Sequence, residues 1–178
     1  MSQSATLYRI TLEHFRMIEK MDAKYVKPAE LTDAYVTFIG SFMGLEFLLS
    51  KGLDKDSQEL IAEIFNPVHY IGPTDTNIFG MENDEEEFWE QADSAGYLSI
   101  KKVKRINALL STINESKVAE HYNADELNEN MIYPICWHND DAADKAFNKR
   151  QIMEDFHTLQ QFFRASAENE NYVLSYVG

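Results

Sequence analysis

Residues Asp33–Gly52 read DAYVTFIGSFMGLEFLLSKG, and this stretch decides how the rest of the chain is interpreted. At 3.6 residues per turn, its large apolar side chains fall on one wide face, which predicts a buried helix over about residues 33–50. Glu46 lies near the centre of that face. Because an isolated buried charge is costly, its carboxylate must be paired, hydrogen-bonded or neutral. The apolar residues of the face are Tyr35, Phe38, Ile39, Phe42 and Leu49.

Two glycines interrupt the same stretch on the side opposite Glu46. Gly40 and Gly44 each cost about 1 kcal/mol relative to alanine inside a helix, so their presence needs a physical reason. We expect another element of the fold to approach closely at these two positions.

The segments on either side alternate between strand-like and helix-like patterns. Residues 5–10 and 172–177 are rich in β-forming side chains and predict a strand near each end of the chain. Capped apolar repeats predict helices between them, including a long one over residues 142–167. This order indicates an α+β fold, in which several helices pack around the buried helix and the terminal strands share a small sheet. The length fits one domain over residues 1–178.

The charge balance is strongly acidic, with 30 Asp and Glu against 16 Lys and Arg and a formal net charge of -14. A field of that sign disfavours nucleic acid and anionic membrane surfaces as partners, whereas it favours encounter with a basic protein. The longest apolar run is too short and too polar to span a membrane. The single cysteine and the lack of a visible signal peptide predict a cytoplasmic protein without an internal disulfide.

A run of acidic residues with two aromatic side chains, ENDEEEFWEQAD, occupies residues 82–93. One interpretation is a solvated helix whose aromatic side chains cover the core. The other is a patch for a basic partner, with a tryptophan anchor and carboxylates that supply charge complementarity. The candidate partner-binding residues are Glu82, Asp84, Glu85, Glu86, Glu87 and Trp89.

Motifs of known chemistry are missing from the sequence. The histidines lack HxxxH, HxH and HExxH spacing, and neither a phosphate-binding glycine motif nor a nucleophile elbow occurs, so no metal, cofactor or catalytic residue is predicted. Cys136 and His138 would lie about 7 Å apart on one side of an extended segment, too far for a nucleophile and its base. A buried cysteine beside an exposed histidine is expected instead.

Glu46 keeps two interpretations open. It is either a buried carboxylate that accepts hydrogen bonds from a tyrosine, tryptophan or backbone donor, or a group of raised pKa that contacts a ligand in a pocket. The expected partner of the carboxylate is Tyr133 or Trp137. The candidate pocket residues are Glu46, Tyr133, Trp137 and His138.

Three segments resemble the YfbM-like family of bacterial proteins, which is described as a domain of unknown function. They are GLEFLLSKG at residues 44–52, YLSIKKVKRINALLSTI at 97–113 and MIYPICW at 131–137. The closing helix and strand follow the same layout, so the resemblance covers essentially the whole chain. It implies a one-domain α+β fold, without an established activity or catalytic residues. The family's His, Trp and Pro at three motif positions are Glu46, Phe42 and Ile100 in this chain.

The expected function is that of a non-enzymatic protein-binding module, specifically an immunity protein that binds and neutralises a cognate bacterial toxin. Small size, a strongly acidic composition and the missing catalytic motif favour this function. The alternative is a small-molecule-binding protein or hydrolase with a pocket near Glu46 and Trp137.

Overall fold

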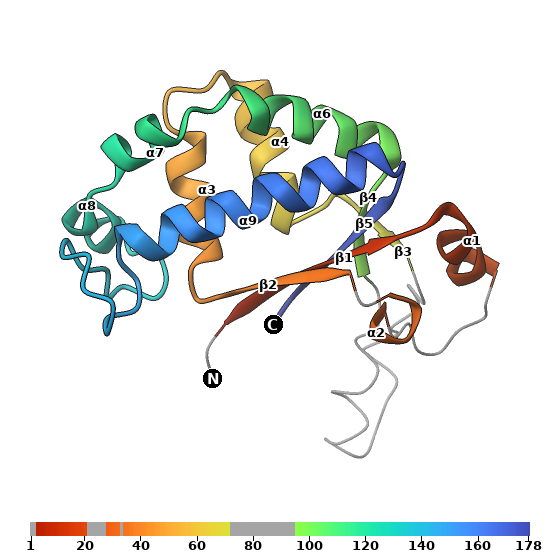
Figure 1. Ribbon diagram of the computed structural model, residues 1–178, viewed down its shortest axis with the longest axis horizontal. Coiled ribbons are helices and arrows are strands. Elements are labelled where there is room, and N and C mark those ends of the chain that lie inside the picture. Colours follow the sequence, from red (N-terminus) through yellow and green to blue (C-terminus); the bar gives the residue numbers. More distant parts are fainter. Residues whose placement is uncertain (1–2, 21–27, 33, 72–94) are drawn as a thin grey trace, which may run out of the picture.

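A computed structural model of the chain describes residues 3–20, 28–32, 34–71 and 95–178 (Figure 1). Its strands form one antiparallel five-stranded sheet in the order β2-β1-β5-β4-β3. The first and last strands pair along most of their length, which brings the two ends of the chain together. The strands are β1 (Ser4–Ile10), β2 (Tyr35–Ile39), β3 (His69–Ile71), β4 (Ala95–Leu98) and β5 (Tyr172–Val177).

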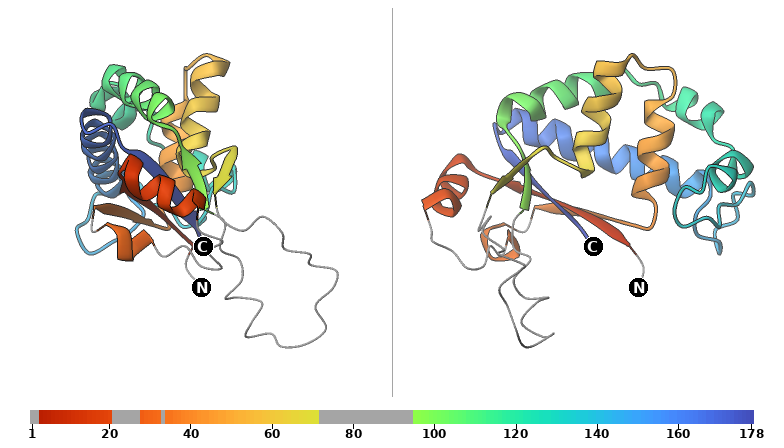
Figure 2. Two further views of the ribbon diagram at one scale, coloured as in Figure 1. Left: turned by 90° about the vertical axis from the view of Figure 1, so that its right-hand side faces the viewer. Right: turned by 180° about the vertical axis from the view of Figure 1, so that it is seen from behind.

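Helices α3, α4, α6 and α9 cover one face of this sheet, and α1 packs on the opposite face (Figure 2). The described helices are α1 (Leu12–Lys20), α2 (Pro28–Leu31), α3 (Phe42–Ser50), α4 (Lys55–Phe65), α6 (Ile100–Thr112), α7 (Glu115–His121), α8 (Ala124–Glu129) and α9 (Lys149–Glu168). The predicted α+β class, with both terminal strands in one sheet, is confirmed.

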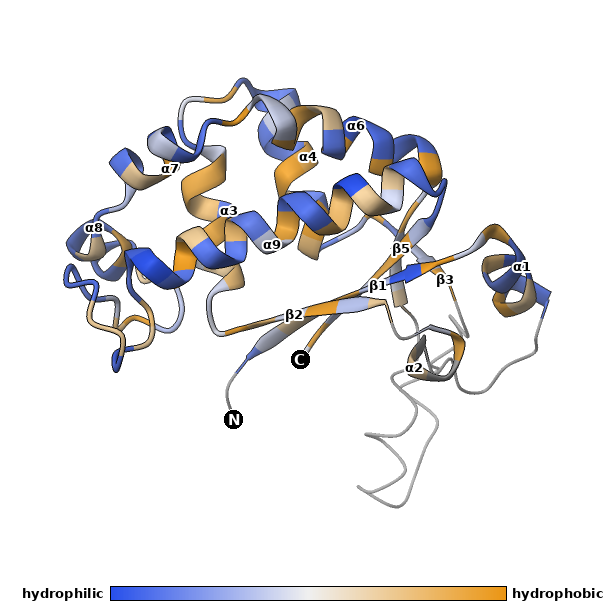
Figure 3. Ribbon diagram, in the orientation of Figure 1, coloured by the Kyte–Doolittle hydropathy of each residue, from blue (hydrophilic) through white to orange (hydrophobic). Residues whose placement is uncertain are grey.

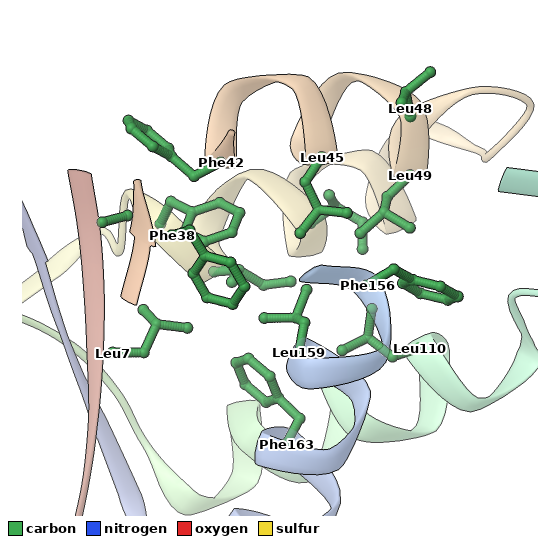
Figure 4. Packing of buried hydrophobic residues seen from close by; sticks show 14 of the residues in the cluster. Leu7, Phe38, Phe42, Leu45, Leu48, Leu49, Leu110, Phe156, Leu159 and Phe163 are labelled. Carbon is green, nitrogen blue, oxygen red and sulfur yellow. The ribbon is translucent and has the colours of Figure 1, made fainter. Parts of the chain in front are cut away.

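The main core lies between the sheet and the helical layer. Leu45 and Leu49 of α3 point toward Phe156 and Leu159 of α9, and Leu7 of β1 closes the cluster from the sheet (Figure 4). Hydropathy follows this arrangement, since α3 is mostly apolar whereas α9 alternates between apolar and polar residues (Figure 3). Helix α3 is therefore the most deeply embedded of these helices, as the apolar stretch predicts.

The predicted helix over residues 33–50 is wrong in its first half. Residues Tyr35–Ile39 form strand β2, and the helix begins only at Phe42. β-Branched and aromatic side chains fill YVTFI and favour a strand. Gly40 then takes a positive φ of 72°, which turns the chain from strand to helix.

The burial of β2 has a period of two and not the 3.6 of a helix. Phe38 is buried against the helical layer, while Tyr35 and Ile39 on the other face are 54% and 60% exposed. Two side chains that the helical wheel placed in the core therefore lie at the surface.

The long C-terminal helix also begins later than predicted. It starts at Lys149 and not at residue 142, because Asn148 caps it by accepting a hydrogen bond from the Gln151 amide at 3.1 Å. The sequence also predicts Ser99 and Asn123 as helix caps, and both are confirmed. Of the two caps that it allows for α4, Asp54 and Asp56, the structure has Asp54. Within the described ranges, no helix has the length and hydropathy that crossing a membrane requires.

Candidate functional site

The beginning of α3 is packed tightly against Trp137. A Cβ added at Gly44 would lie 2.4 Å from two atoms of the Trp137 indole, and one added at Gly40 would lie 2.7 Å from the Phe147 ring. Trp137 is itself buried, and its indole N–H donates to the Ile132 carbonyl at 3.0 Å. The close approach predicted at the two glycines is confirmed, and Trp137 is held as a packing anchor.

Glu46 lies on the other side of α3 and lines a surface pocket of about 630 Å³. Residues from three elements and three connecting segments meet there, which gives an apolar wall with a few polar groups. The lining residues are Phe42, Met43, Glu46, Phe47, Ser50, Lys51, Gly52, Gln58, Asn66, Ile132 and Val177. The i, i+4 spacing of α3 brings Phe42, Glu46 and Ser50 to this face.

The Glu46 carboxylate makes no hydrogen bond and no ion pair with any part of the chain that the structure describes. Desolvation by burial raises the pKa of Glu46 from 4.5 to about 7. The side chain is only partly buried, because it faces the pocket. It therefore changes charge near neutral pH at the wall of a cavity.

Lys51 and Gln58 border the same pocket and already have partners. The Lys51 ammonium donates to Glu126 at 2.5 Å and to the His121 carbonyl at 3.0 Å. Both hydrogens of the Gln58 side-chain amide are donated, to the carbonyls of Ser50 and Leu53. None of these bonds involves Glu46.

The predicted pocket residues are not brought together. Tyr133, Trp137 and His138 are not among the residues that line the Glu46 pocket. The Tyr133 hydroxyl accepts from the Gln3 amide at 3.1 Å, and the indole N–H of Trp137 is bonded elsewhere. The expected partnership of Tyr133 or Trp137 with Glu46 is wrong, because Gly44 and not Glu46 faces the indole.

The segment around Cys136 differs from expectation in one respect. His138 is exposed, as expected, but Cys136 is exposed as well and not buried. In the part of the chain that the structure describes, no group of three His, Cys, Asp or Glu side chains is arranged to hold a metal ion. The candidate partner-binding residues Glu82, Asp84, Glu85, Glu86, Glu87 and Trp89 lie outside the described residues.

Asp155 is a second carboxyl group with an unusual environment, and the sequence does not predict it. Asp155 of α9 is largely buried, and one of its oxygens has no hydrogen-bond partner. Burial raises the pKa of Asp155 to about 6, although the nearby Ser41 hydroxyl opposes that shift. No pattern singles out this aspartate, since it is one of 30 acidic residues in the chain and directly follows the exposed Glu154 on an amphipathic helix.

Strand β2 forms an edge of the described sheet and carries no charged residue. Backbone bonds join Arg9 to Ala34 and Gly40 to Gln3. Because hydrogen bonding alternates along an antiparallel ladder, the amides of Val36 and Phe38 point toward β1. The backbone groups of the three residues that alternate with them point outward. Those residues are Tyr35, Thr37 and Ile39, whose side chains are also exposed.

Such an edge is a template for a further strand. Natural proteins usually protect edges with lysine, proline, a bulge or a covering element. The sequence YVTFI of β2 contains neither lysine nor proline, and its register with β1 is unbroken from Ser4 to Tyr8. This edge and the Glu46 pocket are the two candidate sites of the described structure.

A family model described as a domain of unknown function (DUF1877) matches residues 1–176. The structure is also similar to the crystal structure of a protein of unknown function, YfbM, from Escherichia coli. That similarity has a TM-score of 0.57 at 13% sequence identity and covers 100% of both chains, so it shows a shared fold alone. A comparison of the sequence with curated proteins gives no match.

Proposed function

The chain belongs to the DUF1877 family, whose function is unknown, and we propose that it acts as a non-enzymatic protein-binding module. In this proposal it is a cytoplasmic immunity protein that binds and neutralises a cognate bacterial toxin. The observation that carries the proposal is the uncharged edge strand β2, whose outer side pairs with none of the strands that the structure describes.

Strand addition is the binding mode that this edge supports. A strand from the partner would receive hydrogen bonds from the outward amides of Tyr35, Thr37 and Ile39 and donate to their carbonyls. The exposed Tyr35 and Ile39 side chains, on one face of the sheet, would give the partner apolar contact area. Backbone pairing supplies affinity in this mode, and the side chains beside the edge supply specificity.

The charge of the chain limits the kind of partner. A net charge of -14 attracts a basic protein over long range and repels another acidic one, including a second copy of the chain. We therefore propose a basic toxin as the partner, with electrostatic attraction speeding the encounter and β2 forming the contact.

Co-purification with the product of an adjacent gene tests this function. The chain and a toxin-type neighbour are co-expressed with an affinity tag on one of them, and the toxin's activity is measured with and without the chain. We expect a stable complex and loss of toxicity. A toxin-type neighbour that stays unbound and fully active would contradict the proposal.

Two matched substitutions locate the interface. Ile39→Lys places a charge beside the outward edge of β2, whereas Val68→Lys makes the same change at an equally exposed position just before β3. We expect Ile39→Lys to weaken the complex on the order of tenfold or more, because it places an ammonium group where a strand must pair. Val68→Lys should leave the affinity within about twofold of the unsubstituted chain. Equal losses in both variants would assign the effect to net charge and not to β2.

A second candidate function is small-molecule binding, and the pocket beside Glu46 is the observation that favours it. An apolar wall with a few polar groups is typical of ligand sites, and about 630 Å³ lies within their usual size range of roughly 300–1,000 Å³. The described lining residues include neither His nor Cys, so the pocket supports binding better than hydrolysis.

A further inference from the structure

The Glu46 pocket is lined by two side chains that can carry a charge, Glu46 and Lys51, and only one of them already has hydrogen-bond partners. Lys51 is saturated, because its ammonium contacts the Glu126 carboxylate, the His121 carbonyl and the face of the Phe47 ring at 5.0 Å. Glu46 has none of these contacts from the described chain. A ligand therefore meets one carboxyl group whose charge, when it is ionised, has no ion-pair partner in the described chain.

The polar groups near Glu46 also favour a ligand that donates hydrogen bonds. Gln58 gives both amide hydrogens to backbone carbonyls, which leaves its side-chain oxygen as the free end. The Ser50 hydroxyl lies one helical turn after Glu46 and also lines the pocket. An ammonium group has three donors and no acceptor, which complements a carboxylate flanked by an amide oxygen and a hydroxyl.

Apart from Gly52 and the polar side chain of Asn66, the remaining wall is hydrocarbon. Phe42, Met43 and Phe47 come from α3, and Ile132 and Val177 come from the segments that face it. Aromatic and thioether groups contact alkyl and aryl chains favourably, and aromatic rings also attract cations. The ligand that fits this wall carries an apolar portion next to its charge.

We propose that the Glu46 pocket binds a small organic amine, with the ammonium group against the Glu46 carboxylate and the apolar portion against Phe42, Met43 and Phe47. This inference deepens the second candidate function and is independent of toxin binding, because no residue of β2 lines the pocket. Burial holds the pKa of Glu46 near 7, so an ammonium partner would favour the ionised carboxylate that the empty pocket disfavours.

The test uses three matched probes on the full chain at pH 8. The probes are 2-phenylethylamine, the neutral 2-phenylethanol and the anionic 3-phenylpropionate, titrated into ¹⁵N-labelled protein and followed by amide chemical shifts. We expect the amine to shift the amides of Glu46, Ser50 and Gln58 in a saturable way. The neutral and anionic probes should bind at least about tenfold more weakly, which corresponds to the loss of one charge-assisted contact.

Two variants separate the carboxylate from the general negative field. Glu46→Gln removes the proposed contact, and Glu59→Gln makes the same charge change at an exposed position of α4 outside the pocket. We expect Glu46→Gln to weaken amine binding about tenfold while 2-phenylethanol binding stays unchanged, and Glu59→Gln to change neither. The amide spectrum of each variant reports whether it is folded.

Three results would overturn the proposal. They are amine binding that Glu46→Gln leaves unchanged, equal binding of the amine and the alcohol by the unsubstituted chain, and the absence of saturable shifts at the pocket amides. If the chain does not bind a toxin, none of these three results follows. If the pocket does not bind an amine, the proposal of toxin binding is unaffected. The two proposals can therefore fail separately.

Discussion

Gly44 and Glu46 lie two positions apart on α3 and face opposite surroundings. Gly44 is covered by the Trp137 indole, and Glu46 faces the pocket. Each residue type follows from its surroundings, since a side chain at position 44 would overlap the indole and an ionisable group at position 46 needs access to solvent or a ligand.

Substituting Gly44 tests the packing side of α3. We expect Gly44→Ala to lower the free energy of unfolding by about 1–2 kcal/mol, because overpacking costs more than the roughly 1 kcal/mol that alanine gains in a helix. Urea denaturation measures the change. In a Trp137→Phe background the same substitution should cost about 1 kcal/mol less, since the smaller ring leaves room. An alanine that stabilises the unsubstituted chain would show that the contact is loose.

Substituting Glu46 tests the carboxylate through the pH dependence of stability. Its pKa is about 7 in the folded chain and 4.5 in the unfolded one, so between those values the unfolded state releases a proton that the folded state keeps. The Glu46 contribution to stability therefore falls as pH rises from about 4.5 to 7 and stays low above that.

Glu46→Gln removes this pH dependence. One pKa unit corresponds to about 1.4 kcal/mol, and solvent at a partly exposed side chain reduces the effect. From pH 4 to pH 8, the free energy of unfolding of the variant should therefore rise by about 1–2 kcal/mol relative to that of the unsubstituted chain. Urea denaturation midpoints at the two pH values measure this difference. Asp155→Asn serves as the comparison, because burial also raises the pKa of Asp155. A difference that does not change with pH would mean that Glu46 titrates normally.

Among single residues, the sequence predicts that Glu46 is unusual but does not predict which side chains surround it. Glu46 stands out because every other large side chain on its helical face is apolar. The positions of Tyr133 and Trp137 depend on how the loop after α8 folds back onto α3, which no periodicity encodes. Gln58 and Lys51 carry no signal either, because polar residues near a helix end are normally solvated.

Among the elements, α9 shows how a loop can resemble a helix in sequence. The predicted start at residue 142 is followed by residues that favour helices, yet the helix begins at Lys149. The buried Asn148 side chain caps α9 and also donates to the carbonyls of Ala142 and Lys145. A loop fixed by three side-chain bonds thus replaces two turns of helix.

Removing this cap has a predictable cost. We expect Asn148→Ala to lower the free energy of unfolding by about 2 kcal/mol, because it removes an N-cap and two further hydrogen bonds made by a buried side chain. Asn114→Ala removes the cap of α7 at an exposed position and should cost about 1 kcal/mol or less. Thermal or urea denaturation of the two variants compares them. Equal costs would show that the loop bonds of Asn148 contribute nothing.

The elements that the sequence predicts well have local signals. The terminal strands and the caps Asp54, Ser99 and Asn123 each depend on residues next to one another in sequence. The error at Tyr35–Ile39 arose because positions 35, 38, 39 and 42 fit a helical face, although the β-branched composition and Gly40 favour a strand that turns. Pairing with β1, a contact between distant parts of the chain, decides between the two.

For the whole molecule, the charge of -14 makes a prediction about kinetics. If the partner is basic, the association rate constant should fall on the order of tenfold between low salt and about 0.5 M salt, while the dissociation rate changes little. Stopped-flow mixing or surface-based binding at several salt concentrations measures both. An association rate that is insensitive to salt would exclude electrostatic steering.

The edge and the pocket belong to different regions of the molecule. Strand β2 forms one edge of the sheet, and the pocket lies between α3, α4 and the end of β5. One chain could therefore bind a protein and a small amine at the same time, because no lining residue of the pocket belongs to the proposed protein interface.

Amide hydrogen exchange of β2 tests directly whether the partner adds a strand at this edge. Exchange is measured for the chain alone and mixed with the toxin-type product of the neighbouring gene. In the free chain, the outward amides of Tyr35, Thr37 and Ile39 should exchange quickly, and the inward amides of Val36 and Phe38 slowly. We expect binding to slow the exchange of the three outward amides to rates like those of the inward pair. A complex that inhibits the toxin while these three amides still exchange quickly would contradict strand addition at β2.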